Sequence, residues 1–111
     1  MGRKNLKENA MKGPENSFKY RSLLLQIIKK YASADCKVYL FGSRACGMHS
    51  AGSDIDLALD AGKKIDSALM GKIRQDVEES IIPFFVDVVD VYAVSKLMKE
   101  EIKRDGILWN Q

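Results

Sequence analysis

One stretch of the chain restricts its fold more than any other, because it joins two short apolar runs through a connection rich in glycine and serine. The first run, residues 38–41, ends at Gly42 and Ser43, and the second run covers residues 55–59. Apolar runs of this length bounded by glycine are typical of strands. The stretch therefore predicts a strand, a glycine turn and a second strand.

Two aspartates stand at the start of the second run, two residues apart. Because strand side chains alternate between faces, Asp54 and Asp56 are predicted to project on one face, opposite to Ile55, Leu57 and Leu59. Two carboxylates are thereby placed close together beside the glycine turn.

The rest of the chain supplies helices and a third strand for the same sheet. Tyr20, Leu23, Leu24, Ile27, Ile28 and Tyr31 recur at three- and four-residue spacing, which indicates an amphipathic helix. The predicted elements are a helix from about 16 to 31, a strand at 36–41, a short helical turn at 43–47, a strand at 54–59, a helix at 65–79, a strand at 84–91 and a helix at 94–102 that Gly106 stops. We expect an α/β (α+β) fold, a small mixed sheet with helices packed on it.

The chain has 111 residues, which allows one domain at most. Residues 1–15 have no apolar period and are expected to be a mobile basic segment, so the predicted domain covers 16–111. Nine basic and three acidic residues precede residue 38, but a solvated helix face explains this excess, so direct nucleic-acid binding is not expected. Two cysteines outside any zinc-binding spacing and no membrane-spanning run favour a soluble, cytoplasmic protein.

The residues around the turn suit phosphate and metal chemistry. Gly42 permits close approach of a ligand to the backbone, and Ser43 at the start of a helical turn offers free N–H groups to an anion. Two carboxylates and phosphate oxygens are the hard ligands that Mg²⁺ prefers. A third carboxylate on a neighbouring strand would complete a two-metal site, and Asp87 is the candidate.

These residues resemble a known family. Gly42-Ser43, ten residues, and then Asp54-Ile55-Asp56 are similar to the signature of the polymerase-beta-like nucleotidyltransferase superfamily. The sequences around them resemble its minimal nucleotidyltransferases, called MNT proteins. The likeness covers about residues 17 to 109.

The resemblance implies the fold, the site and the reaction. Nucleoside triphosphate, usually ATP, is expected at Gly42 and Ser43, with two Mg²⁺ ions at Asp54, Asp56 and Asp87. The reaction implied is transfer of a nucleoside monophosphate, usually AMP, to a hydroxyl with release of pyrophosphate. MNT proteins are often encoded with a helical HEPN toxin, so a HEPN-type partner is expected, with this chain as a type VII-like antitoxin, and either a homo-oligomer or a hetero-oligomer is possible.

Several residues keep two interpretations. Arg44 is placed in the nucleotide site because guanidinium pairs with phosphate, yet it equally suits an ion pair with Asp56. Asp87 is preferred to Asp90 as the third carboxylate because the family's third acid falls at the first aspartate of this strand. His49 and Cys46 lie near the turn but are not assigned catalytic roles. Cys36 is predicted to be buried, and Trp109 and the Phe84-Phe85 pair are core or partner surface, with core preferred.

Two other functions remain open from the sequence. A non-catalytic antitoxin would keep the fold and neutralise its partner by contact alone. A small-molecule nucleotidyltransferase, of the kind that modifies antibiotic hydroxyls, would need a separate substrate-binding subunit. The base preference, the acceptor and the oligomeric state do not follow from the sequence.

Overall fold

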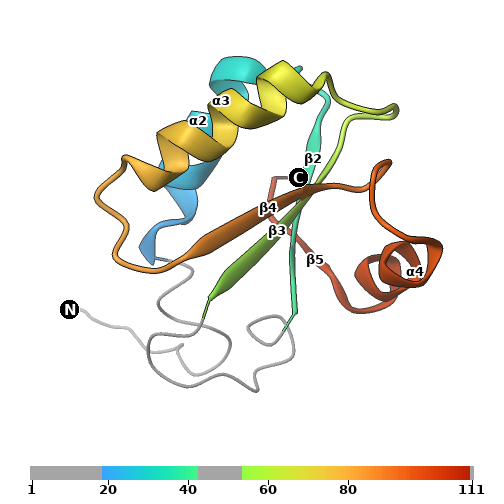
Figure 1. Ribbon diagram of the computed structural model, residues 1–111. Helices are drawn as coiled ribbons and strands as arrows, with labels where there is room; N and C mark the ends of the chain where they lie inside the picture. The colour runs from blue at the N-terminus through green and yellow to red at the C-terminus, as the bar shows by residue number, and fades with distance from the viewer. Residues whose placement is uncertain (1–18, 43–53, 111) are drawn as a thin grey trace.

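The computed structural model describes residues 19–42 and 54–110, whose arrangement is shown in Figure 1. Their helices and strands are α2 (Arg21–Tyr31), β2 (Lys37–Phe41), β3 (Ile55–Asp60), α3 (Ser67–Glu78), β4 (Val86–Asp90), α4 (Lys96–Asp105) and β5 (Ile107–Leu108). None of the described helices has the length and apolar character needed to cross a membrane. The predicted mobile segment 1–15 and the predicted helical turn at 43–47 lie outside the described residues.

The described strands form one mixed sheet in the order β4-β3-β2-β5. Strand β2 runs antiparallel to both β3 and β5, whereas β3 and β4 are parallel. A parallel pair needs a crossover connection, and α3 provides it between β3 and β4. The predicted class, a small mixed sheet with helices packed on it, is confirmed.

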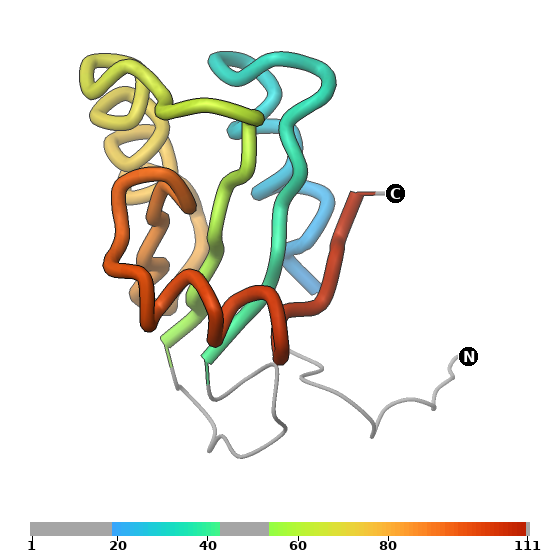
Figure 2. Tube along the Cα trace, turned by 90° about the vertical axis from the view of Figure 1, so that its right-hand side faces the viewer, coloured from blue at the N-terminus to red at the C-terminus, as the bar shows by residue number. Residues whose placement is uncertain are grey.

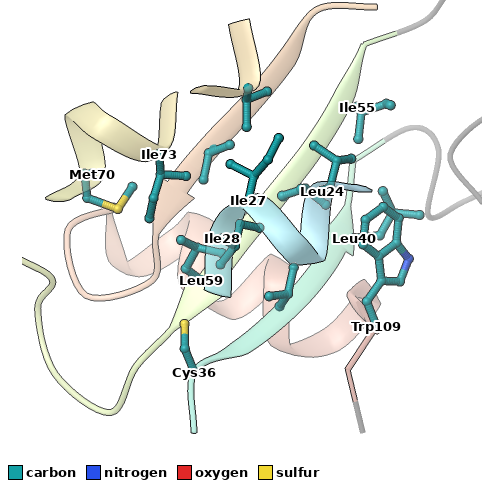
Figure 3. Packing of buried hydrophobic residues seen from close by; sticks show 14 of the residues in the cluster. Leu24, Ile27, Ile28, Cys36, Leu40, Ile55, Leu59, Met70, Ile73 and Trp109 are labelled. Atoms are coloured by element: carbon teal, nitrogen blue, oxygen red, sulfur yellow. The ribbon is translucent and has the colours of Figure 1, made fainter. Parts of the chain in front are cut away.

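Helices α2 and α3 lie together on one face of the sheet and cover the main core (Figure 1). Ile55, Leu57 and Leu59 are fully buried on this face, as strand alternation predicted. The buried side chains of the two helices are Leu24, Ile27, Ile28, Met70, Ile73 and Val77. Figure 3 shows Leu24 and Leu40 next to Trp109, which is buried in this core as preferred.

A carboxylate on α3 ties it to the end of α2. Asp76 Oδ2 accepts a hydrogen bond from the Tyr31 hydroxyl at 2.8 Å and one from Lys30 Nζ at 3.1 Å. These two donors, with Tyr31 first, lower the pKa of the Asp76 carboxyl because they stabilise its charged form. The two helices are thereby linked at their exposed surface as well as through the core.

Helix α4 lies apart from α2 and α3, on the opposite face of the sheet (Figure 1). It contributes Ile102 to a second, smaller cluster with Phe41, Ala58 and Val91. The spacing of Val94, Leu97, Met98 and Ile102 in the sequence predicts one apolar stripe for this helix. In the structure, Ile102 is the one buried side chain of α4, and Leu97 is 78% exposed. The spacing predicted the helix correctly but overstated its buried face.

Two details of the chain depart from the sequence prediction. Helix α3 begins at Ser67 rather than at Ile65, because the preceding residue, Asp66, has a non-helical ψ of 132°. The Ile65 backbone N–H donates to Asp90 Oδ2 at 2.7 Å. Gly106 does end α4, but its φ of −69° is open to any residue. The need for glycine there is steric, since a Cβ at Gly106 would collide with the carbonyl oxygen of Ile102.

The apolar end of the chain forms a strand that was not predicted. β5 pairs with β2 through Tyr39–Leu108 and Leu40–Ile107, and the Trp109 N–H then donates to the Val38 carbonyl at 2.8 Å. Asn110 continues this pairing with its side chain: Oδ1 accepts from the Val38 N–H at 2.8 Å and Nδ2 donates to the Cys36 carbonyl at 2.7 Å. One side-chain amide therefore replaces a strand residue at the edge of the sheet.

We expect Asn110→Ala to lower the free energy of unfolding by about 1–3 kcal/mol, because it leaves two partly buried backbone groups without partners. Chemical denaturation measures the change. Gln75→Ala is the matched control, since it removes an amide whose hydrogen bond to Glu79 is exposed. Equal effects of the two substitutions would contradict the role of Asn110.

Candidate active site

The predicted site residues gather at one end of the sheet. In Figure 2 the end of β2 and the start of β3 lie side by side at this end, and the register pairs Phe41 with Asp56. Strand β4 is parallel to β3 and begins at the same end. This end of the sheet therefore carries the residues that follow β2 and those that begin β3 and β4.

Asp56 and Asp87 are direct neighbours on adjacent strands. Their Cα atoms are partners in the parallel register of β3 and β4, so both side chains project from the same face of the sheet. Adjacent strands lie about 4.8 Å apart. Asp56 is half-buried and Asp87 is exposed. Two negative charges at this spacing repel each other unless a cation or hydrogen-bond donors compensate them. A bound cation would remove this repulsion, so the pair suits a cation site.

Asp54 stands one residue before β3 and is exposed. Its separation from Asp56 gives it the same side of the strand wherever the backbone stays extended. Helix α4 lies on this face and contacts it through the cluster of Phe41, Ala58 and Ile102, which leaves the rest of the face uncovered by α4. The three predicted carboxylates thus belong to the open end of that face.

Gly42 is held against Asp56. Its φ is +79°, in the left-handed region that favours glycine, and a Cβ built at this position would lie too close to Asp56 Oδ2 for any non-bonded pair. The turn after β2 therefore approaches the carboxylate as closely as a backbone without a side chain permits. A ligand at Gly42 would sit directly beside Asp56.

Asp90 has a different role in the structure. It is 4% exposed, and its two carboxylate oxygens accept backbone hydrogen bonds from Ile65 at 2.7 Å and from Tyr92 at 2.9 Å. These contacts lie at the end of β4 farthest from Asp56. Its environment is that of a structural carboxylate that fixes two loops, and the geometry favours Asp87 as the third acid.

The oxygen ligands that the aspartates offer, and the positions of these aspartates on neighbouring strands, suit Mg²⁺. Aspartate oxygens on β3 and β4 and the open backbone at Gly42 are what a magnesium–phosphate complex requires. Within residues 19–42 and 54–110, no three acidic, histidine or cysteine side chains already form a compact ligand cluster. The register places Asp56 beside Asp87, so these two carboxylates are the pair that rotation about their side-chain bonds could bring to one ion.

Four residues singled out in the sequence, Ser43, Arg44, Cys46 and His49, lie outside the described residues. The other cysteine, Cys36, is buried as predicted, and it precedes β2 rather than opening it. Burial raises the pKa of the Cys36 thiol to about 11, so it is protonated and unreactive at neutral pH.

Two residues near the site were not recognised from the sequence. Arg74 of α3 reaches the edge of the sheet, where its Nε donates to the Val88 carbonyl at 3.0 Å. Phe85, expected to share the core with Phe84, is 66% exposed. The only signal for Phe85 was its place two residues before Asp87, on the same face of an alternating strand.

The sheet, the crossover helix and the paired aspartates beside a glycine turn define a nucleotidyltransferase. The family profile described as "Polymerase beta, Nucleotidyltransferase" matches residues 24–110, and this chain belongs to that family. The resemblance noted in the sequence is thereby confirmed, and with it the class of enzyme.

One sequence relative and two solved structures are similar to this chain. The probable protein adenylyltransferase MntA of Haemophilus influenzae is 29% identical over 84 residues, which are 76% of this chain and 69% of that protein. A toxin-antitoxin crystal structure with AMP-PNP shares 24% identity and superimposes with a TM-score of 0.68, covering 80% of this chain and 71% of that one. The tri-AMPylated Shewanella oneidensis HEPN toxin in complex with MNT antitoxin gives 20% identity and a TM-score of 0.65, over 84% and 71% of the two chains. At these identities, the two structures establish a shared fold.

Proposed function

We propose that this chain is an adenylyltransferase that moves AMP from ATP to a hydroxyl group of a HEPN-type protein and thereby acts as its antitoxin in the cytoplasm. The observation that carries the proposal is the Asp56–Asp87 register beside Gly42. It is supported by the MntA relative and by the toxin-antitoxin complexes with AMP-PNP and with an AMPylated HEPN toxin, which share the fold.

Each residue has a defined part in this reaction. Gly42 would let the triphosphate approach the backbone, with Ser43 and Arg44 as further phosphate contacts, and Asp54, Asp56 and Asp87 would hold two Mg²⁺ ions. When bound, these ions neutralise the charge of the triphosphate and orient it. The acceptor oxygen forms a bond to the α-phosphorus while the bond to pyrophosphate breaks; pyrophosphate keeps the electron pair and the hydroxyl proton passes to water. The protein contributes positioning and electrostatic stabilisation.

The test is incubation with Mg²⁺, ATP labelled at the α-phosphate and a HEPN protein, taken first from a reading frame adjacent to this chain's gene. We expect the label on a tyrosine of the HEPN protein and equimolar release of pyrophosphate. Protein that binds ATP but never labels the HEPN protein would overturn the transferase proposal.

A double substitution distinguishes neutralisation by AMP transfer from neutralisation by binding alone. In Asp54→Asn with Asp56→Asn, we expect the complex with the HEPN protein to persist while its neutralisation is lost. Neutralisation that survives the double substitution would identify a non-catalytic antitoxin instead.

A further inference from the structure

Arg74 is the side chain of α3 that reaches the outer edge of the sheet. Strand β4 ends the order β4-β3-β2-β5, so among the described strands it is paired on one side only. Arg74 Nε donates to the Val88 carbonyl of this strand at 3.0 Å. Among the described residues, Arg74 lines both a cavity of about 290 Å³ beside Val86 and one of about 310 Å³ beside Val89 and Asp90. The bond therefore lies midway along β4, with a cavity on each side of it.

The Val88 carbonyl points away from the rest of the sheet. The Phe85 carbonyl accepts from the Ile55 N–H at 2.9 Å, so Phe85 turns its backbone groups toward β3. Alternate residues of a strand turn these groups to opposite sides. Asp87 and Val89 therefore face β3 as Phe85 does, whereas Val88 faces the outer edge. At this carbonyl, a donor from α3 takes the place of a further strand.

The position of Asp87 depends on this outer edge. Asp87 directly precedes Val88 and stands opposite Asp56 in the register of β3 and β4. Like charges that face each other on neighbouring strands repel and weaken the pairing. Strand β3 has a neighbour on both sides and β4 on one, so the repulsion acts to displace β4 outward. A bond from α3 to the peptide group that follows Asp87 by one residue opposes this displacement.

We propose, resting on the function proposed above, that Arg74 is a positioning residue of the active site: its bond to the Val88 carbonyl holds β4, and with it Asp87, in place beside Asp56. Arg74 acts through the strand and not on the substrate, because the Val88 side chain is buried in the main core under α3 while Asp87 projects from the opposite face. A small movement of the strand is sufficient, since a misplacement of about 1 Å can lower a rate by about a hundredfold.

Arg74→Met removes the donor and keeps an apolar stem over the strand. We expect kcat for AMP transfer to fall about tenfold and the Mg²⁺ concentration for half-maximal rate to rise, while the KM for the HEPN acceptor stays unchanged. Arg74→Lys keeps a charged donor at the end of a long side chain and should restore most of the rate. Lys72→Met is the matched control, since Lys72 is exposed on the same helix, and it should leave kcat unchanged.

A second variant distinguishes positioning from a general loss of stability. Asp90→Asn weakens the contacts at the far end of the same strand, where Asp90 accepts from the Ile65 and Tyr92 N–H groups. We expect the rate per folded molecule to fall in Arg74→Met and to stay unchanged in Asp90→Asn. An equal fall in both variants would make the effect of Arg74 one of stability alone and overturn the proposal.

Amide hydrogen exchange tests the proposal in protein without metal or nucleotide. The Asp87 and Val89 N–H groups face β3, so we expect Arg74→Met to raise their exchange rates about tenfold through local opening of the edge strand. The Ala58 N–H faces β2, and its exchange rate should not change. Unchanged exchange at Asp87 and Val89, or faster exchange together with a wild-type transfer rate, would overturn the proposal. Faster exchange in a protein that transfers nothing would keep Arg74 as the residue that holds Asp87 in place and refute only the reaction.

Discussion

Asp87→Asn is expected to lower the rate of AMP transfer by at least about a hundredfold while the fold stays intact. The carboxylate is exposed and in register with Asp56, and its proposed role is to hold metal rather than to stabilise the folded chain. Losing one electrostatic contact to the reacting centre has effects of about this size. An isosteric change at an exposed position alters the free energy of unfolding by about 0.5 kcal/mol or less. Transfer of labelled AMP and thermal unfolding measure the two effects.

Asp90→Asn, three residues along the same strand, should behave in the opposite way. Its two oxygens accept from the Ile65 and Tyr92 N–H groups, and an asparagine has only one oxygen to offer. One buried N–H then faces an amide NH₂, which costs about 1–3 kcal/mol of stability. The folded fraction should keep its transfer activity. If Asp90→Asn removes activity without loss of stability, and Asp87→Asn does the reverse, the assignment of the third carboxylate is wrong.

Gly42→Ala is expected to remove both activity and stability. A non-glycine residue at a φ of +79° costs about 1–2 kcal/mol. The added Cβ also collides with the Asp56 carboxylate, which must rotate away or move the end of the strand. Because the collision displaces a proposed metal ligand, we expect at least about a hundredfold loss of transfer rate and a weaker effect of Mg²⁺ on ATP binding.

Gly62→Ala measures the cost of backbone strain at a positive φ without the collision that an added Cβ causes at Gly42. Gly62 has a φ of +81°, almost the same as Gly42, but an added Cβ there would have nothing within 4 Å among the described residues. The loss of stability, measured by chemical denaturation, should match the backbone part of the Gly42→Ala effect, and the transfer rate per folded molecule should not change. A similar loss of activity in both variants would show that backbone strain alone explains the result at Gly42.

The burial of side chains on single strands and helices could be predicted from the sequence, because it follows from the local periodicity of each element. The alternation around Asp54 and Asp56 follows from strand geometry, so the burial of Ile55, Leu57 and Leu59 on the opposite face was predictable. The same holds for the stripe of Leu24, Ile27 and Ile28 on α2, whose helical period places these residues on one face.

Other features depend on residues that are distant in the chain. The two-residue strand β5 is too short to have a pattern of its own, and it exists because β2 offers a free edge that Asn110 helps to close. Phe85 is 66% exposed, although its neighbour Phe84 is partly buried against the core and its ring meets that of Tyr20 edge-on. Leu97 is exposed because α4 meets the sheet mainly through Ile102.

The sequence by itself determined the facing of the aspartate pair, which depends on strand geometry within a few residues, and the family, which follows from the spacing of Gly42-Ser43 and Asp54-Ile55-Asp56. Only the tertiary structure decided that Asp56 stands in register with Asp87, that Gly42 lies against the Asp56 carboxylate and that Asp90 is held by Ile65 and Tyr92. The physical reason is that pairing between strands and packing between distant segments select one arrangement among several that the same local patterns allow.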